Sequence, residues 1–570
     1  MITCGLKLTH DGGVAVFDGS RLLFSVEVEK LSNNPRHAEG DRLDVVEEIL
    51  AAEGMDPADV DVFVVDGWHA AGAEPVARLS VRNRDRAVAL SVAPYHETPT
   101  RDGALTPYHG DGLPLGGRDR SYVSYHHATG HVFAAYSTSP FAARGEPAHV
   151  LSWDGGMLPL LYEVRPEPFA VRSLGPLLPL YGNAFTEFAG HFAPYRAEFT
   201  AEQVAFGRTR PSGVAGKAMA YAGLGRADAV AELGTLLDEA DVISIETGAA
   251  LGRDVQRQRD LLFPGRTDAD LIASFQEYLG RQLVGAFRRV LGGRATAGKV
   301  NLCLSGGCAL NIKWNSALRS SGLFAEVWVP PFPNDAGSAL GTACAHLAGA
   351  RGEVSVAWDP YQGPHLVPPE LPPGWQRERC DPAGVARLLH EQGQPVVVLD
   401  GRAELGPRAL GNRSILAPAD DPKMKDRLNE MKGRESYRPV APICLEAFAP
   451  QVFDPGTPDP YMLFDHAVRD EWRDRIPAAV HLDGTARLQT VNPGQHPVLA
   501  EILASYAERT GVPVLCNTSA NHQGRGFFPD ASSAMRWGAA EYVWSQSWLY
   551  TAPGAAKLTG APKLDGGTAS

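Results

Sequence analysis

The sequence has few cysteines and no spacing of them that would build a zinc ribbon or a disulfide framework. Seven are scattered over 570 residues, at Cys4, Cys303, Cys308, Cys344, Cys380, Cys444 and Cys516. Small secreted domains depend on dense disulfides, and structural zinc sites depend on paired cysteines, so both classes are excluded. A sparse set of thiols suits a reducing compartment, and we expect a cytoplasmic protein.

Long hydrophobic runs and an excess of basic residues are also missing. No apolar stretch is long enough to cross a bilayer, and the N-terminus enters a strand-like run without the basic and apolar regions of a signal peptide. The 66 acidic residues outnumber the 53 basic ones, and the formal net charge is −13. We therefore expect neither a membrane nor a nucleic-acid partner.

The chain contains 44% hydrophobic and 21% charged residues, as an ordinary globular protein does. It opens with three strand-like runs joined by tight turns, ITCGLKLT, GVAVFDGS and RLLFSVEVE. A similar unit, HVLSWDGG followed by MLPLLYEVR, comes much later. The order strand, Asp-Gly turn, strand, turn, strand thus occurs around Asp11 and again around Asp154. This predicts the internal duplication of a sub-domain.

Helical spacing dominates residues 228–291, and two strand-turn-helix units follow, VNLCLSGGCALNIKWNSAL and EVWVPPFPNDAGSALGTACAHL. The stretch 358–375 is rich in proline and lacks periodicity, which is typical of a linker. A new α/β pattern begins at PVVVLDGR. The sequence therefore predicts an α/β protein with an N-terminal domain over 1–357, a linker over 358–375 and a second α/β domain over 376–570.

Several glycine-containing turns in the first domain predict a nucleotide site. Glycine lets a turn approach a polyphosphate closely, and a helix N-terminus favours an anion. Any one such turn is ordinary turn chemistry, but their order along the chain favours ATP binding. The predicted nucleotide residues are Asp11 and Gly12 in the first hairpin, Gly306, Gly307 and Asn311 in SGGCALN, and Asp335 and Gly337 in NDAGSALG.

The segment HHATGH predicts a metal site. On a helix, His127 and His131 share a face, so both imidazoles could bind one ion. Asp335 is our candidate for a third ligand. Such a donor set suits Fe(II), Mn(II) or Zn(II), and the spacing cannot choose among them. For the cofactor we expect a divalent metal, Fe(II) first, with Mn(II), Zn(II) or Mg(II) as alternatives. The competing interpretation is two polar histidines on a surface helix. His10 is our candidate general base, or else a residue that only shapes the first turn.

The second domain carries cations in two loop-rich segments, at Arg402, Arg408, Arg413, Lys432, Arg434 and Arg438. Cations among glycine and proline predict a pocket for a small oxyanion rather than a solvated charged face. A polar group follows a strand, at Asn517, Thr518, Ser519 and Asn521, and could bind a carbonyl, amide or phosphate.

The segments ELGPRALGNRSILAP, KGRESYRPVAP and VPVLCNTSAN closely resemble the C-terminal motifs of the O-carbamoyltransferases of nodulation-factor and antibiotic biosynthesis. HDGGVAVFDG, HHATGH, GKAMAYAGLG, LSGGCALN and FPNDAGSALG follow the same family in order. The resemblance implies a duplicated actin/sugar-kinase-like ATPase domain, similar to the TsaD-type protein of tRNA threonylcarbamoylation, followed by a YrdC-like α/β domain. The YrdC pattern is matched here by Lys432, Arg434, Ser519 and Asn521.

The resemblance also implies an activity. Carbamoyl phosphate would bind in the second domain, at Arg408, Arg413, Lys432, Arg434, Asn517, Ser519 and Asn521. Carbamate and ATP would give carbamoyl-adenylate in the first domain, where the metal would hold the phosphates. His10, Lys432 and Arg408 are the implied catalytic residues. His10 would activate the acceptor, a hydroxyl of a natural product such as an antibiotic, macrolide or glycoside.

Two other classes stay open from the residues alone. The first domain is also compatible with a small-molecule kinase, which would release ADP rather than AMP and pyrophosphate. A non-catalytic ATP-binding scaffold is the second alternative, and it would leave the cationic loops of the second domain without a role. The acidic balance disfavours a tRNA-modifying enzyme. The acceptor, the metal and the oligomeric state are not assigned by the sequence.

Overall fold

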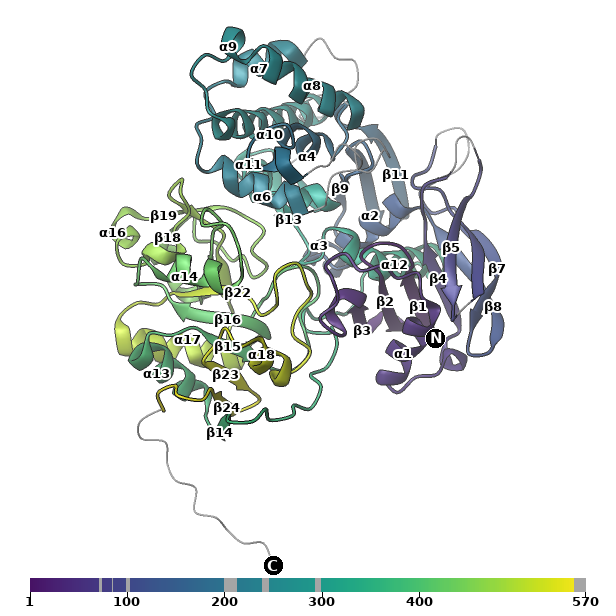
Figure 1. The fold of residues 1–570 in the computed structure, drawn as a ribbon. Coiled ribbons are helices and arrows are strands. Elements are labelled where there is room, and N and C mark those ends of the chain that lie inside the picture. The colour runs from purple at the N-terminus through teal and green to yellow at the C-terminus, as the bar shows by residue number, and fades with distance from the viewer. Residues whose placement is uncertain are drawn as a thin grey trace, which may run out of the picture. The chain divides into compact units, whose positions relative to one another are not determined.

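The computed structural model describes residues 1–70, 74–84, 86–98, 103–198, 213–237, 245–292 and 299–557. They form two compact units (Figure 1). The first consists of Met1–Gly363 with the short segments Leu405–Pro407 and Leu463–Asp465, and the second of Pro364–Glu404, Arg408–Met462 and His466–Ser570. The division after Gly363 falls inside the proline-rich stretch that we predicted to be a linker. The sequence did not indicate that the two short segments belong with the first unit.

Two sheets form the framework of the first unit. One has the strand order β3-β2-β1-β4-β8-β7 and the other β11-β10-β9-β12-β13. Their strands are β1 (Ile2–Lys7), β2 (Gly13–Asp18), β3 (Arg21–Glu27), β4 (Val62–Asp66), β7 (Tyr108–Leu115), β8 (Arg118–Tyr125), β9 (Ala148–Ser152), β10 (Leu160–Pro166), β11 (Phe169–Pro176), β12 (Val300–Ser305) and β13 (Phe324–Trp328). A separate hairpin pairs β5 (Ala77–Asn83) with β6 (Arg86–Val92).

The two sheets repeat one pattern of strand pairing. In each, three strands form an antiparallel meander, β1-β2-β3 or β9-β10-β11. The first strand of the meander then pairs in parallel with a later strand, β4 or β12, which pairs in parallel with the next. Asp11 follows β1 and Asp154 follows β9, so the two Asp-Gly turns occupy equivalent places. This repeated topology agrees with the duplication that the sequence predicted, and the mixed α/β class is confirmed.

The helices of the first unit are α1 (Leu43–Ala52), α2 (His127–Ser137), α3 (Pro140–Ala143), α4 (Ala184–Ala189), α6 (Gly213–Ala222), α7 (Val230–Leu237), α8 (Ile245–Arg257), α9 (Arg259–Leu262), α10 (Asp268–Gly292), α11 (Ile312–Ser320) and α12 (Ser338–Arg351). Helices α7 to α10 occupy the predicted helical region, of which residues 238–244 lie outside the described residues. The predicted strand-turn-helix units are β12 with α11 and β13 with α12.

Small residues bring α2 and α12 into direct backbone contact. A Cβ atom on Gly341 of α12 would lie 2.0 Å from the carbonyl oxygen of Gly130 on α2. Strand β1 also approaches α12 closely, because a Cβ on Gly5 would lie 2.0 Å from the carbonyl oxygen of Ala339. Side chains alternate along a strand, so Lys7 projects from the same face of β1 as Gly5. Leu6 points to the opposite face and joins a buried apolar cluster there.

The second unit is built on one sheet of order β14-β24-β23-β15-β16-β22-β17-β21, with a three-stranded sheet β18-β19-β20. Its strands are β14 (Gln376–Arg379), β15 (Val396–Leu399), β16 (Arg413–Pro418), β17 (Ala441–Leu445), β18 (Phe453–Asp454), β19 (His466–Val468), β20 (Thr485–Ala486), β21 (Gln489–Val491), β22 (Leu515–Ser519), β23 (Tyr542–Ser545) and β24 (Trp548–Thr551). Parallel and antiparallel pairs both occur in the larger sheet. This unit is therefore mixed α/β, and its specific likeness to the YrdC fold stays a prediction.

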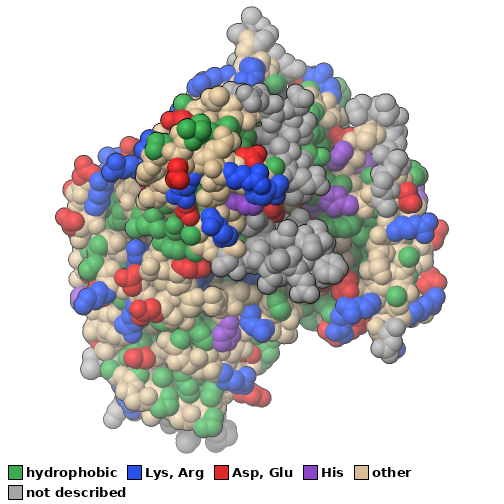
Figure 2. Space-filling view, turned by 45° about the horizontal axis from the view of Figure 1, so that its top comes forward, with side chains coloured by type: hydrophobic (Ala, Val, Ile, Leu, Met, Phe, Trp, Pro, Cys, Tyr) green, Lys and Arg blue, Asp and Glu red, His purple; other side chains and the backbone are tan. Residues whose placement is uncertain are grey.

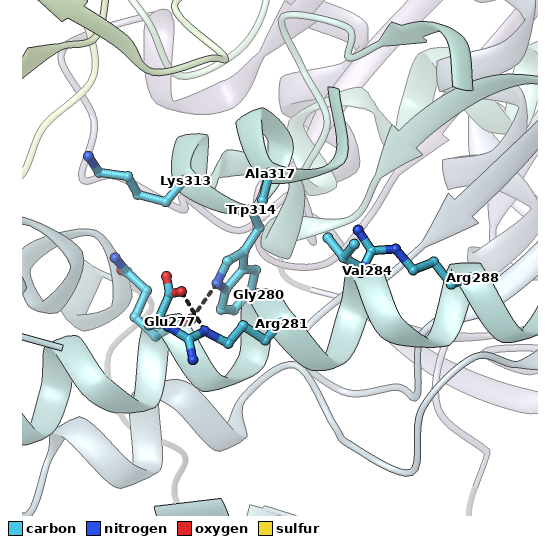
Figure 3. A pocket seen from close by; sticks show the side chains of 9 residues that line it. Glu277, Gly280, Arg281, Val284, Arg288, Lys313, Trp314 and Ala317 are labelled. Atoms are coloured by element: carbon cyan, nitrogen blue, oxygen red, sulfur yellow. Dashed lines mark hydrogen bonds and ion pairs between the residues drawn. The ribbon is translucent and has the colours of Figure 1, made fainter. Parts of the chain in front are cut away.

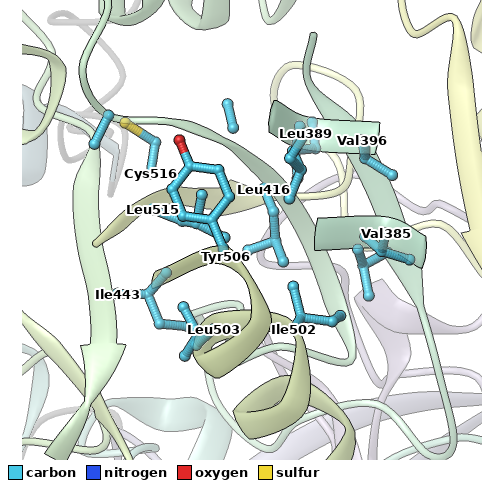
Figure 4. Packing of buried hydrophobic residues seen from close by; sticks show 14 of the residues in the cluster. Val385, Leu389, Val396, Leu416, Ile443, Ile502, Leu503, Tyr506, Leu515 and Cys516 are labelled. Carbon is cyan, nitrogen blue, oxygen red and sulfur yellow. The ribbon is translucent and has the colours of Figure 1, made fainter. Parts of the chain in front are cut away.

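Helices α13 (Pro382–Gln392) and α17 (Pro497–Thr510) pack on each other in the second unit. Figure 4 shows Leu503 and Tyr506 of α17 among buried side chains of the sheet. Both helices begin with proline, which needs no hydrogen-bond donor in the first turn, and both end at a left-handed glycine. The remaining helices are α14 (Met424–Met431), α15 (Ala449–Val452), α16 (Asp470–Arg473) and α18 (Ala531–Trp537).

Among the described residues, no helix is both long and apolar enough to pass through a bilayer. On the face presented in Figure 2, Lys and Arg side chains are interspersed with Asp and Glu side chains.

The contact between α2 and α12 predicts a strong effect of a single methyl group. Gly341→Ala would push the two helices apart, so we expect a loss of about 1–3 kcal/mol of unfolding free energy. Gly349→Ala is the matched control, because its Cβ would meet only ordinary contacts at 3.5 Å or more. That control should stabilise α12 by about 0.5–1 kcal/mol. Thermal unfolding followed by circular dichroism compares the variants, and equal midpoints would contradict the packing described here.

Candidate active site

Two histidines and two aspartates meet in the first unit, and we call His127, His131, Asp154 and Asp335 the donor cluster. Each offers one ligand atom, and these atoms lie within 4.8 Å of one another. His127 begins α2 and His131 lies one turn later on the same face. Asp335 lies in the short turn before α12. The contact between α2 and α12 therefore brings both imidazoles to the same carboxylate.

Three atoms of the donor cluster face one another, and we call them its inner atoms. Nε2 of His127 and Nε2 of His131 each lie 3.3 Å from Oδ1 of Asp335. Both imidazoles are fully buried, and none of the three atoms has a hydrogen-bond partner among the described residues. Buried polar atoms of this kind destabilise a protein unless another group satisfies them. Two imidazole nitrogens and one carboxylate oxygen fit a divalent metal of the borderline class.

A second ring of charged side chains holds these ligands in place. Oδ2 of Asp66, at the end of β4, lies 2.7 Å from Nδ1 of His127. A carboxylate on the outer nitrogen leaves Nε2 of that ring to face an ion, as is usual in metal-binding histidines. Lys7 donates to the same oxygen of Asp66 at 2.9 Å and lies 3.0 Å from Oδ2 of Asp335. Lys7 and Asp66 are each at most 2% exposed.

The charges of this network reinforce one another. Burial alone would raise the pKa of Asp335, but Lys7 and His127 lower the pKa of that carboxyl well below its usual range. Burial opposes protonation of His127, yet the carboxylate of Asp66 and that of Asp335 raise the pKa of His127 to about 9. The pKa of Lys7 is likewise raised, because Asp335 and Asp66 outweigh the effect of burial. The network is thus an ionised one, stabilised by close opposite charges.

Asp154 closes one side of the donor cluster and is itself held by two hydrogen bonds. Gly307 donates its backbone N–H to Oδ1 of Asp154 at 2.7 Å, and the hydroxyl of Tyr95 donates to Oδ2 at 3.0 Å. The ring of Trp68 lies edge-on to His127, with 5.8 Å between ring centroids. The Lys7 ammonium lies 4.4 Å from the Trp68 ring centroid. Aromatic rings therefore line the ionised network.

His10 lies beside the donor cluster, and Asp11 holds its ring. Nδ1 of His10 is 2.9 Å from Oδ2 of Asp11, and Nε2 lies 3.6 Å from Oδ2 of Asp335. Burial opposes protonation of His10, but the contact with Asp11 and the charge of Asp335 raise its pKa. The other oxygen of Asp11 lies 2.8 Å from Nδ1 of His37. Asp11 thus orients two imidazoles, whereas the sequence suggested a nucleotide contact.

The turns predicted to bind a nucleotide lie in close contact with other backbone segments of the protein. Their N–H groups already donate hydrogen bonds within it. Gly12 donates its N–H to the carbonyl of Ala38 at 2.9 Å, and Gly306 donates to Pro333 at 2.7 Å. Gly306 has a φ of +84°, and a Cβ there would lie 2.3 Å from the backbone of Trp153. These two N–H groups are therefore not available to a phosphate. Glycine permits a close backbone contact within the protein at these turns, whereas we predicted a close approach to a polyphosphate.

Asn311 and Gly337 also have local structural roles. The side chain of Asn311 caps α11 by accepting from the backbone N–H of Lys313 and of Trp314. A Cβ on Gly337 would lie 2.3 Å from the carbonyl oxygen of Phe332, so this glycine permits the turn that carries Asp335. Of the predicted nucleotide residues, only Asp335 places its side chain in the donor cluster.

The second unit brings together four of the predicted anion residues, and we call Lys432, Arg434, Ser519 and Asn521 the lysine cluster. The Lys432 ammonium is buried and donates to the carbonyl and hydroxyl oxygens of Ser519. It also donates to the backbone and side-chain oxygens of Asn521. Arg434 donates to the hydroxyl of Ser519 at 3.4 Å and to that of Thr518 at 3.2 Å. Two cations thus converge on one strand end, at the end of β22.

The loop that precedes β16 is organised by a buried carboxylate. Oε1 of Glu404 accepts from the backbone N–H groups of Leu410, Asn412 and Arg413, at 2.7, 2.8 and 3.0 Å. The guanidinium of Arg413 donates to backbone carbonyls of the same region, including Asp400 at 2.7 Å. Burial lowers the pKa of Arg413 to about 10. Arg413 therefore holds this loop together and is not part of the lysine cluster, while Arg408 lies half-buried within the loop.

The remaining predicted residue of this group, Asn517, also has a buried role. Its amide donates to Oε1 of Gln489 at 2.7 Å and to the carbonyl of Ala409 at 3.1 Å. Asn517 pairs with Leu416 across β16 and β22, and Ser519 pairs with Ser414. The amide of Asn517 thus ties the loop to the strand that carries Ser519.

A cavity of about 410 Å³ lies between α10 and α11 and shares no residue with the donor cluster (Figure 3). Its floor includes Trp314, whose indole donates to the carbonyl of Gln276 at 2.9 Å. Two of the cations that line it have carboxylate partners, since Arg281 donates to Glu277 at 2.7 Å and Lys313 donates to Asp465 at 2.7 Å.

Sequence reasoning missed four charged residues of these sites. Lys7 was detectable as the one charged residue within an otherwise uncharged strand, ITCGLK, and Asp66 ends the apolar strand VFVVD. Asp154 lies in the duplicated turn but was not proposed as a ligand. Glu404 carries no local signal, because its partners are backbone N–H groups six to nine residues later.

The comparisons with known proteins cover nearly the whole chain. The family Carbamoyltransferase N-terminus matches residues 2–344, and Carbamoyltransferase C-terminus matches residues 386–544. Nodulation protein U of Bradyrhizobium diazoefficiens is 46% identical over 570 residues and covers 97% of each chain. The 3'-hydroxymethylcephem-O-carbamoyltransferase of Streptomyces clavuligerus is 32% identical over 545 residues, with 94% of this chain and 96% of that one covered.

One solved structure, the activator of the 2-hydroxyisocaproyl-CoA dehydratase from Clostridium difficile with bound ADPNP, aligns with 62% of this chain and 96% of its own. Its identity is 13% and the TM-score is 0.31, a likeness too low to support any conclusion about this chain.

His496 contacts Asn412 in the loop held by Glu404, and we predict that this contact is sensitive to acid. Nδ1 of His496 accepts from the N–H of Leu499, which caps α17, and Nε2 lies 2.9 Å from Oδ1 of Asn412. Burial lowers the pKa of His496 to about 4. Since the unfolded chain takes up this proton at about pH 6.5, the stabilisation is complete above that pH. It is lost as the pH falls from about 6.5 to 4, by about 3 kcal/mol.

His496→Asn should flatten this dependence, because asparagine caps a helix but does not titrate. The measurement is the thermal midpoint of both proteins between pH 7.5 and 4.5. We expect the native protein to lose more stability than the variant on acidification. Parallel curves would show that His496 is not the responsible group.

Proposed function

This chain belongs to the carbamoyltransferase family, and we propose that it transfers the carbamoyl group of carbamoyl phosphate to a hydroxyl of a small-molecule acceptor at the expense of ATP. The observation that carries the proposal is the pair of built polar sites, one in each unit. The first unit holds the donor cluster, and the second holds the lysine cluster. A single phosphoryl-transfer site would leave the second of these without a purpose.

The lysine cluster is our proposed site for carbamoyl phosphate. Lys432 and Arg434 supply positive charge for the phosphate, and the amide and hydroxyl of Asn521 and Ser519 suit the planar carbamoyl end. Arg408 enters from the loop that Glu404 and Arg413 hold rigid. Attack of water at the carbamoyl carbon releases phosphate and leaves carbamate, which must be shielded from bulk solvent.

ATP is proposed to react in the first unit. An oxygen of carbamate attacks the α-phosphorus, the bond to the β-phosphate oxygen breaks, and pyrophosphate leaves. His127, His131 and Asp335 would hold a divalent metal, for which their buried and unsatisfied atoms are the support. When bound, that ion offsets the negative charge of the phosphate oxygens. Two imidazole ligands favour Fe(II) or Zn(II) over Mg(II), and the carboxylate ligand also suits Mn(II).

His10 is the proposed base for the acceptor. Asp11 fixes the ring through Nδ1, which leaves Nε2 to take the proton of the hydroxyl. The hydroxyl oxygen attacks the carbamoyl carbon of carbamoyl-adenylate, and AMP leaves with the electron pair. A hydroxyl acceptor is supported by the relative that carbamoylates a hydroxymethyl cephem. Its occurrence on an antibiotic, macrolide or glycoside remains part of the proposal.

Nucleotide products test this function directly. Purified protein is incubated with ATP, carbamoyl phosphate and Fe(II) or Mn(II), with and without hydroxyl compounds, and the nucleotides are identified by mass spectrometry. Carbamoyl-adenylate, or AMP with equal pyrophosphate, is expected only when carbamoyl phosphate is present. ADP with a phosphorylated compound would overturn the proposal in favour of a small-molecule kinase.

Lys432→Met separates the two half-reactions. Removing a buried cation from an oxyanion site costs roughly 2–5 kcal/mol, so we expect the carbamoyl-phosphate-dependent rate to fall about 30-fold or more. Lys423→Met is the matched control, because Lys423 is exposed at the other end of α14. ATP binding should be unchanged in both variants. A normal rate in Lys432→Met would remove the lysine cluster from the mechanism.

The metal site is tested by ion content rather than by activity. His131→Asn removes a fully buried ligand whose Nε2 lies 3.3 Å from Oδ1 of Asp335. We expect less than about one tenth of the native metal content after dialysis, measured by plasma mass spectrometry. His346→Asn is the control, since this buried histidine belongs to α12 but not to the donor cluster. Full occupancy in His131→Asn would refute the ligand assignment.

A further inference from the structure

Lys7 is a buried charged residue beside the donor cluster, and the proposed reaction gives it no task. It lies on β1, is 1% exposed, and projects from the strand face that packs on α12. A lysine that binds substrate must reach solvent or a ligand, and this one is enclosed. An ammonium group is also costly to bury, so its presence needs a reason within the protein.

The surroundings of Lys7 supply that reason. Its Nζ lies 3.0 Å from Oδ2 of Asp335 and 2.9 Å from Oδ2 of Asp66, and it is 3.3 Å from Nδ1 of His127. The face of Trp68 covers it at 4.4 Å. Lys7 therefore touches the outer atoms of one carboxylate ligand and one imidazole ligand of the donor cluster. It contacts neither of the inner atoms, Oδ1 of Asp335 and Nε2 of His127.

Two consequences follow for an ion in the donor cluster. Lys7 engages the outer oxygen of Asp335, so that Oδ1 alone is presented to the histidine nitrogens. Lys7 also sets the net charge of the donor cluster together with the neighbouring Asp66. Asp66, Asp154 and Asp335 contribute three negative charges and Lys7 one positive charge, which leaves two to be neutralised. One divalent ion balances that number once it has displaced the proton of His127, because both imidazoles are neutral when they act as metal ligands.

We propose that Lys7 is a positioning residue that limits Asp335 to one-oxygen ligation and matches the donor cluster to a single divalent cation. The inference rests on the metal site of the proposed function. By offsetting the carboxylates, Lys7 also leaves the bound ion with more effective positive charge toward an incoming phosphate oxygen. A tighter site would hold the ion more strongly but would make it a weaker electrophile.

Lys7→Met tests the proposal, because methionine has nearly the length of lysine without its charge. Binding of Mn²⁺ and of Tb³⁺ to metal-free protein is measured by calorimetry. Coulomb repulsion by the lysine scales with the charge of the ion. We therefore expect Lys7→Met to bind Mn²⁺ at least about tenfold more tightly than the native protein does. The ratio of its Tb³⁺ affinity to its Mn²⁺ affinity should rise by a further tenfold or so.

Co²⁺ provides a readout of ligation. With Oδ2 of Asp335 released, the carboxylate can chelate, and a higher coordination number weakens the visible absorption of Co²⁺. We expect a lower molar absorption in Lys7→Met than in the native protein. Lys30→Met is the matched control, because Lys30 is an equally buried lysine of the first unit that pairs with Glu27 at 2.7 Å and is absent from the donor cluster. It should keep the native affinities and spectrum.

A double variant guards against failure of Lys7→Met to fold. Lys7→Met with Asp66→Asn restores the net charge of two negatives, so the preference for Mn²⁺ over Tb³⁺ should return toward the native value. The inference would be overturned if Lys7→Met kept the native affinities and the native ion preference. It would also be overturned if the ion preference of the double variant were no nearer to the native value than that of Asp66→Asn alone. If the native protein binds none of these ions, the metal site of the proposed function fails instead.

Discussion

The site in the first unit depends on one carboxylate, that of Asp335. Asp335 presents one oxygen to two histidines and the other to Lys7, and it can do so only because α12, α2 and β1 meet at backbone distance. Glycine at positions 5, 130 and 341 makes that approach feasible. The fold therefore concentrates three carboxylates, one ammonium and two imidazoles in a space from which most water is excluded. Such a cluster is stable only if its charges balance, and this condition links the metal proposal to the role inferred for Lys7.

A buried carboxylate organises the second unit in a different way. Glu404 gathers three backbone N–H groups of the loop before β16, while Arg413 satisfies the carbonyls of the same loop. The loop that presents Arg408 is thus fixed from within. Lys432 and Arg434, by contrast, are held by oxygens at the end of β22. Rigid supports of this kind reduce the entropy lost when a small anion is bound.

Much of this organisation could be predicted from the sequence. The duplicated strand-turn-strand pattern predicted two related sheets, and the four-residue spacing of His127 and His131 predicted a shared helical face. Motif order predicted the family. What could not be predicted were contacts between distant segments, such as Lys7 with Asp66 and Asp335, because a lone charge in a strand does not identify its partners. Nor does the sequence reveal that the N–H groups of Gly12 and Gly306 bond the carbonyls of Ala38 and Pro333. The nucleotide contact predicted at these turns stays a prediction.

In the proposed site, His127, His131 and Asp335 bind one divalent ion while Lys7 retains the outer oxygen of Asp335. A crystal structure of the metal-loaded protein, with anomalous diffraction measured on both sides of the metal's absorption edge, tests it most directly. We predict a single anomalous peak bonded to Nε2 of both histidines and to Oδ1 of Asp335, with the Lys7 ammonium still beside Oδ2. An ion bound elsewhere, or one chelated by both oxygens of Asp335 with Lys7 displaced, would contradict this account.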